Sequence, residues 1–243
     1  RVSADSGVFE GQAFLEGVLT AIGDLIILPS VILTANAVKA SKLYSVTPNV
    51  DLGDFNFVRN TTKTRTNSLG VNEIVAINVA SIDYGTGSPV ILIEPQRTNI
   101  LLNSDIVVNQ SVTTTATATN LSFTGTGTIT LSGSFSGSLA GTGVNNRVTL
   151  NFTPSAGTLN ISVSGTCIRG QIAEGTFMTS YIPTLNAAVT RNLDLFNKSG
   201  VSTLINSQRG VLFLEVASLD NGTSLSGFSI ANGQPGGSVP NGI

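Results

Sequence analysis

One stretch of this chain is almost free of charge. Between Ser104 and Thr166 the only charged side chains are Asp105 and Arg147. Apolar residues alternate there with Ser, Thr and Asn, a period that places one face of a strand in a core and the other in water. Glycines interrupt the pattern about every eight to twelve residues, which is typical of a sandwich or barrel. The stretch therefore predicts a mainly β fold with a β-sandwich resembling a jelly roll.

The expected strands of this sandwich follow the alternation. Two glycine pairs, Gly125–Gly127 and Gly141–Gly143, lack the lysine and the following helix of a phosphate loop, so we interpret them as hairpin turns. Cys167 stands in a strand-like segment, 163–168, and is expected to be a small buried residue rather than a reactive thiol. The predicted strands are Gln110–Ala118, Asn120–Phe123, Gly127–Phe135, Arg147–Phe152 and Thr158–Ser164.

The N-terminal part, residues 1–50, predicts a helical and extended anchoring segment. Apolar residues recur near a 3.6-residue period through residues 1–28. Three glycines weaken such a helix by about 1 kcal/mol each relative to Ala, so it needs a partner. Docking to a neighbouring protein and packing as an ordinary core helix both stay open. The residues expected to dock are Phe9, Phe14, Leu15, Val18, Leu19 and Ile22.

Residues 51–103 predict an adaptor of short strands. Phe55 and Phe57 alternate with polar residues and are expected on one face of a strand. Gly70 closes a predicted turn at a left-handed position. Val90–Ile93 is apolar on both faces and is expected to be buried. The remaining expected strands are Val31–Leu33, Lys42–Val46, Asn72–Ile77 and Ile82–Tyr84.

The sandwich is assigned to residues 104–185, and residues 186–243 to a linker and the beginning of a distal β domain. Residues 183–209 are expected to connect the two. Gly210–Ala217 has the composition of a strong strand. Because the chain begins with Arg1 and ends in a Gly- and Pro-rich tail, we expect it to be part of a longer protein.

The composition argues against several classes of function. Charged residues make up 11% of the chain, against roughly 25% in a typical soluble domain. Scattered basic residues and a net charge of -2 do not predict nucleic-acid binding. The chain has no histidine, so histidine-based catalytic triads and the usual zinc sites are excluded. No cofactor or metal is expected. Its most apolar run, Leu25–Leu33, is too short for membrane insertion.

Paired carboxylates remain the enzymatic hypothesis, because a glycosidase needs two of them about 5–10 Å apart. The candidates are Asp83, Glu94, Glu174 and Asp194. We favour a structural role, in which Glu94 and Glu174 accept backbone N–H bonds or pair with Arg97 and Arg191. The residues expected to form structural ion pairs are Arg59, Arg65, Asp83, Glu94 and Arg97.

Several segments resemble a family of bacteriophage fibre-like virion proteins. Ile91–Asn99 is similar to the family pattern LLIEPQxTN, and Gly170–Thr184 resembles its pattern ending in FxTSYIPT. Weaker similarity is carried by residues 54–67, 78–84 and 188–191, and residues 125–159 are similar to a phage head spike fibre domain. The chain departs from the family pattern at Lys63, Thr66, Ala80 and Ser81.

This resemblance implies a structural appendage on a phage capsid or tail, usually a homotrimer, that mediates adhesion to the host surface. It supplies no catalytic residues. The implied partners are further copies of the chain, a capsid vertex or tail protein at the N-terminus, and a host glycan or protein at the distal end. Two alternatives stay open: a polysaccharide depolymerase with its active site beyond residue 243, and a bacterial or prophage surface adhesin.

Overall fold

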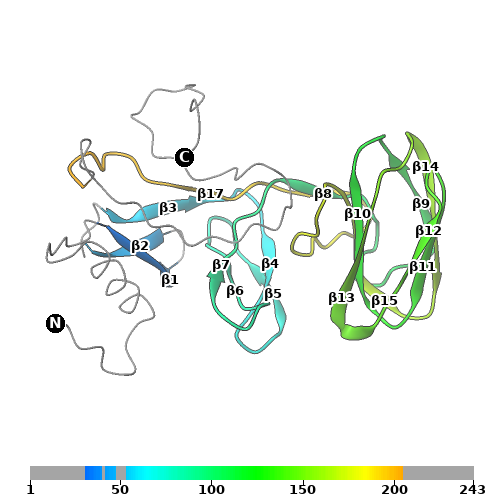
Figure 1. Cartoon of the computed structure of the whole chain (residues 1–243), viewed down its shortest axis with the longest axis horizontal. Coiled ribbons are helices and arrows are strands. Elements are labelled where there is room, and N and C mark those ends of the chain that lie inside the picture. Colours follow the sequence, from blue (N-terminus) through cyan, green and yellow to red (C-terminus); the bar gives the residue numbers. More distant parts are fainter. Residues whose placement is uncertain (1–30, 40–41, 48–52, 205–243) are drawn as a thin grey trace, which may run out of the picture. The chain divides into compact units, whose positions relative to one another are not determined.

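The computed structural model describes residues 31–39, 42–47 and 53–204, and the fold there is mainly β, built from short antiparallel strands (Figure 1). The predicted N-terminal helix and the predicted strand Gly210–Ala217 lie outside the described residues. The same holds for the six residues expected to dock.

The first sheet joins the early and the late parts of the chain. Its order is β1-β2-β3-β17, with the strands β1 (Ile32–Lys39), β2 (Lys42–Thr47), β3 (Phe55–Val58) and β17 (Leu195–Asn197). Phe57 is 1% exposed, and the Phe55 ring stacks on Phe196 with the centroids 4.9 Å apart. Residues 183–209 therefore contain pairing strands, although the sequence predicts only connecting structure there.

Two small hairpins follow. One pairs β4 (Lys63–Thr66) with β5 (Asn72–Val75), and the other pairs β6 (Ile82–Asp83) with β7 (Val90–Ile91). The turn of the first hairpin holds Gly70 at a φ of 75°, which confirms the predicted left-handed position.

The prediction that Val90–Ile93 is buried is wrong. Val90 is 39% exposed and Ile93 is 50% exposed, whereas the adjacent Glu94 is 2% exposed. The physical reason is that only Val90–Ile91 forms a strand, in a two-stranded sheet, so little packs over this run.

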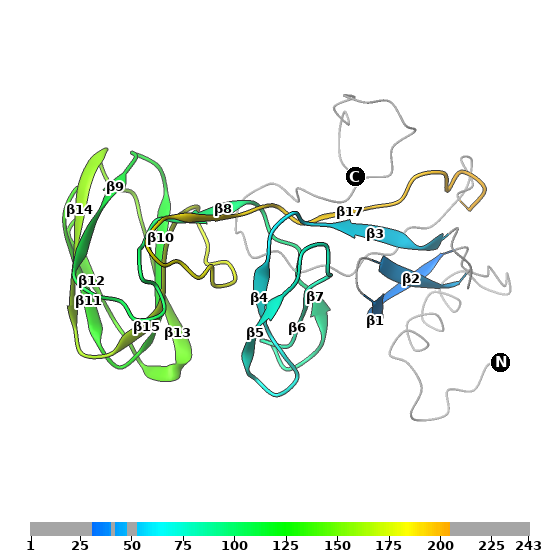
Figure 2. The same ribbon diagram turned by 180° about the vertical axis from the view of Figure 1, so that it is seen from behind.

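The sandwich region contains two sheets that face each other across one core, as Figure 2 shows from behind. The three-stranded sheet has the order β13-β10-β15, and the four-stranded sheet has the order β12-β11-β14-β9. The strands are β9 (Gln110–Thr114), β10 (Thr119–Gly125), β11 (Thr128–Gly133), β12 (Gly137–Ala140), β13 (Gly143–Phe152), β14 (Gly157–Ser164) and β15 (Cys167–Glu174).

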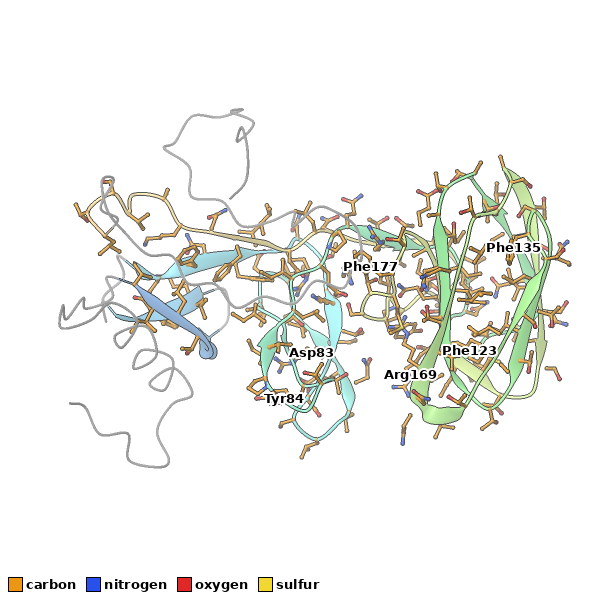
Figure 3. The ribbon with its side chains drawn as sticks, viewed as in Figure 1. Asp83, Tyr84, Phe123, Phe135, Arg169 and Phe177 are labelled. Atoms are coloured by element: carbon orange, nitrogen blue, oxygen red, sulfur yellow. The ribbon has the colours of Figure 1, made fainter. Side chains whose placement is uncertain are left out.

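The core between these sheets follows the predicted alternation. On β11, Ile129 and Leu131 are buried while Thr130 and Ser132 are exposed. Figure 3 labels Phe123, which is fully buried in this core, and Phe135, which packs against it. Removing such apolar area from water contributes about 25 cal/mol per Å².

The glycine pairs do not form hairpin turns. β10 and β11 belong to different sheets, and so do β12 and β13, so both glycine turns lead the chain from one sheet to the other. Gly125 shows why glycine is needed: its φ is 135°, and a Cβ there would lie 2.1 Å from the Thr166 carbonyl oxygen.

The segment around Cys167 is also corrected. A turn at Gly165, with a φ of 75°, separates β14 from β15, so residues 163–168 are not one strand. Cys167 is 2% exposed, and burial raises the pKa of its thiol, as expected for an apolar core residue.

A two-stranded ladder, β8 (Arg97–Asn99) with β16 (Val189–Arg191), lies where the chain enters and leaves the sandwich region. The Asn99 side chain is fully buried and connects this ladder to β15 and to the following loop. It donates to the carbonyls of Gly170 and Ile182 and accepts from the backbone N–H groups of Leu101 and Ile172.

Candidate functional site: a buried charge network

Five charged side chains form one buried network. They come from three parts of the sequence: Arg59 and Lys63, Glu94, and Arg191 and Asp194. Cations and anions alternate along the network. The nitrogen–oxygen distances are 3.0 Å for Arg59–Asp194, 2.7 Å for Asp194–Lys63, 2.9 Å for Lys63–Glu94 and 2.8 Å for Glu94–Arg191. Each of these side chains is at most 1% exposed.

Strand pairing brings these residues together. Arg59 follows β3 directly and Asp194 precedes β17, so the pairing of β3 with β17 sets the distance between them. Arg191 is the last residue of β16, which pairs with β8 just beyond Glu94. The backbones of Glu94 and Asp194 also meet, since the Asp194 N–H donates to the Glu94 carbonyl. The network therefore depends on contacts between distant segments.

Neutral groups satisfy most of the remaining donors and acceptors. Arg59 donates to two backbone carbonyls, and Lys63 donates to the Leu92 carbonyl. Glu94 accepts hydrogen bonds from the backbone N–H and the hydroxyl of Ser180. Arg191 donates to the Ser180 hydroxyl and the Pro95 carbonyl, although its Nε has no partner. Removing one member would leave a buried charge without its partner, at a cost of about 3–5 kcal/mol.

The charges around Glu94 determine its protonation. Burial alone would raise the pKa of this carboxyl, but the charges of Lys63 and Arg191 and the hydrogen bonds from Lys63 and Ser180 outweigh burial, so the pKa is lowered. For Arg191, burial lowers the pKa and the nearby carboxylates oppose that effect. Glu94 is therefore ionised at neutral pH.

The four candidate carboxylates are not arranged as a glycosidase pair. Asp83, labelled in Figure 3, accepts hydrogen bonds from the backbone N–H groups of Thr66 and Gly85. Glu174 is exposed and accepts a hydrogen bond from Thr115. Only Glu94 and Asp194 come together. Neither carboxylate reaches the surface, so a polysaccharide has no access to the space between them.

Two of the residues expected in structural ion pairs, Arg59 and Glu94, belong to the network. Glu94 pairs with Arg191 and accepts a backbone N–H bond from Ser180, as expected, and it also pairs with Lys63. Arg59 pairs with Asp194.

The remaining expected residues lie elsewhere. Arg65 pairs with Glu73, because the two residues face each other in the β4–β5 register. Arg97 lies over the Phe177 ring, 5.1 Å from its centroid, and donates to the Gln96 carbonyl. Asp83 caps a turn through backbone N–H groups.

Several of the segments singled out in the sequence analysis meet around this network. Asn78 accepts from the Arg59 backbone N–H, and its φ of 57° is one that asparagine tolerates. The Thr64 hydroxyl donates to the Tyr181 carbonyl. Together with the Glu94–Ser180 bonds, these contacts connect residues 54–67, 78–84, 91–99 and 170–184. Arg191, through its pair with Glu94, connects residues 188–191 to the same group.

Two further buried polar groups fix the loop 175–184 on the sandwich. Arg147 donates to the Thr179 carbonyl and the Ser122 hydroxyl, and burial lowers the pKa of its guanidinium to about 10. The Tyr181 hydroxyl donates to Asp105 and lies 2.7 Å from the Ser104 hydroxyl oxygen, and burial raises its pKa. The two charged residues of the 104–166 stretch thus serve to attach this loop.

The outer face of the four-stranded sheet is neutral and polar. Thr130 faces Ser162 on one side and Ser138 on the other, and all three are exposed. Asn160 faces Ser132 and accepts a hydrogen bond from the Ser111 hydroxyl at 2.8 Å. Hydroxyl and amide groups therefore form rows across the strands.

The chain was compared with known protein families, curated proteins and solved structures. No family model, no curated protein and no solved structure matches the chain. Within residues 31–39, 42–47 and 53–204, no three Cys, Asp or Glu side chains gather as a metal site would require. In that same part of the chain, no helix has the length and apolarity needed to cross a membrane.

Proposed function

We propose that this protein is a structural fibre or spike component of a bacteriophage virion, which assembles as a homotrimer and contributes to adhesion to the host surface. The supporting observation is the junction around the buried network. The segments that resemble phage fibre proteins supply its interior contacts, such as Glu94–Arg191 and Glu94–Ser180. Residues that hold a fold together are what a structural family is expected to share.

The surface chemistry supports an adhesive role. The rows of Ser, Thr and Asn on the four-stranded sheet carry no charge and offer both donors and acceptors to neutral polyhydroxylated ligands. A single neutral hydrogen bond contributes only about 0.5–1.5 kcal/mol, so useful affinity needs many copies of this face. A trimer displayed many times on a particle would supply them.

The test is to locate the chain on purified particles by cryo-electron microscopy, with a tag on the chain and an untagged particle as control. Density for the chain at a capsid vertex or on a tail supports the proposal. Particles that lack the chain would refute it and favour the cellular or prophage adhesin. Release of reducing sugar from host capsule by the full-length protein would instead favour a depolymerase.

A further inference from the structure

The centre of the charge network holds one lysine amine against two carboxylates. Lys63 Nζ lies 2.7 Å from Oδ2 of Asp194 and 2.9 Å from Oε2 of Glu94. All three side chains are at most 1% exposed. The network thus holds three groups together away from water. They are the Lys63 amine, the Asp194 carboxyl group that could acylate it, and the Glu94 carboxylate, which could transfer protons.

We infer that Lys63 and Asp194 become joined by an intramolecular isopeptide bond, with Glu94 acting as the proton-transfer group. The bond would form between Nζ and the Cγ carbon of Asp194. This covalent modification is independent of the proposed virion role, since it depends only on the folded chain.

The reaction balances as a condensation without redox change or cofactor. Glu94 takes one proton from the Lys63 ammonium and passes it to the Asp194 carboxylate. The free amine then attacks Cγ, and the carbonyl electron pair moves onto oxygen. Glu94 removes a second proton from nitrogen and delivers it to Oδ2, which leaves as water while the C=O bond re-forms. One ammonium and one carboxylate thereby give one amide and one water, and Glu94 is regenerated.

The surroundings of Asp194 favour this chemistry. Arg59 Nη1 lies 3.0 Å from Oδ1, and the Glu94 backbone N–H donates to Oδ2 at 2.8 Å. Arg59 would stabilise the negative charge that develops on Oδ1 in the tetrahedral intermediate, as an oxyanion-hole donor does, while the Glu94 N–H holds the leaving oxygen Oδ2 in place. Fixed neighbouring groups react with effective molarities of about 10⁵–10⁸ M, which compensates for a slow acylation by an unactivated carboxyl.

Burial also favours the product over the ion pair. Two charges withdrawn from water carry a desolvation penalty, and a neutral amide does not carry it. The amide carbonyl can still accept from Arg59, and Glu94 keeps its contacts with Arg191 and Ser180. Because the site is closed to water, hydrolysis of the amide, which would reverse the reaction, is slow.

The bond would close a loop between positions 131 residues apart, with the whole sandwich region inside it. Unfolding of the sandwich would then leave β4 and the segment before β17 attached to each other. A denatured chain would migrate faster on a denaturing gel than its linear form.

The deciding experiment is intact mass spectrometry of the purified, fully denatured chain. We expect a mass lower than the sequence mass by one water molecule, and a fragment spectrum that joins the peptide containing Lys63 to the peptide containing Asp194. A wild-type mass equal to the sequence mass would overturn the inference, whatever the variants do.

Variants assign the roles. Lys63→Arg and Asp194→Ala should show the full mass, whereas Lys42→Arg, a lysine 4.0 Å from Asp54 and 37% exposed, should keep the deficit. Asp194→Asn should lose ammonia in place of water if this residue is the acylating group. Glu94→Gln should leave most chains uncrosslinked while circular dichroism shows the β fold retained. Complete crosslinking in Glu94→Gln would refute the role of Glu94 as the proton-transfer group.

Discussion

Replacing Arg191 by Met tests whether the network stabilises the fold. The variant removes the 2.8 Å contact to Glu94 and leaves the Ser180 hydroxyl and the Pro95 carbonyl without their donor. Breaking a buried pair from one side costs about 3–5 kcal/mol. With a urea m-value of about 2 kcal/mol/M, the unfolding midpoint should fall by about 1.5–2.5 M.

The matched control is Arg65→Met, which breaks the Arg65–Glu73 pair at side-chain exposures of 28% and 37%. An exposed pair contributes about 0.2–1 kcal/mol, so the midpoint should move by at most about 0.5 M. Urea titrations followed by circular dichroism, with and without 1 M NaCl, separate the two cases. Salt should abolish the control effect and leave most of the Arg191 effect, because buried pairs are screened less. Equal small losses in both variants would refute the reasoning.

Three further predictions concern the core, a turn and the pH dependence. Leu159→Ala, at a fully buried core position, should lower the free energy of unfolding by about 2–5 kcal/mol in denaturant titrations. Gly125→Ala should lower the melting temperature more than Gly143→Ala, because both have positive φ but only Gly125 places a Cβ against backbone; equal losses would contradict this. Since the pKa of Glu94 is lower in the folded than in the unfolded state, its stabilisation is present above about pH 4.5 and is lost as pH falls through the folded value. Acid titration of the wild type should therefore show a steeper loss below pH 4.5 than Glu94→Gln, and identical slopes would refute the assignment.

Strands with several alternating residues could be predicted from sequence. In β11 and β14 apolar residues alternate with neutral polar residues, and both strands appear close to the expected bounds. β8, β16 and β17 have three residues each, too few to show a period. For Val90–Ile93 the sequence predicts burial that the structure does not show, because no neighbouring layer covers this apolar run.

The site was less accessible to prediction than the strands. The resemblance segments offer Arg97 and Arg191 as partners of Glu94, and the one that pairs with it is Arg191, 97 residues away, rather than the nearby Arg97. In the sequence Lys63 stands out only as a departure from the family pattern, yet it lies at the centre of the network. No local signal marks such a lysine, because its burial depends on how β17 pairs with β3.

That pairing also determines how the protein would respond to tension. Asn56 faces Asn197, so the chain enters β3 and leaves β17 at the same end of the pair. A pulling force on the flanking segments would peel the strands apart one residue at a time, which needs little force per step. The peeling would then reach Arg59, Lys63 and Asp194, which several strong contacts hold together. The junction would act as a mechanical stop that shields the sandwich from load.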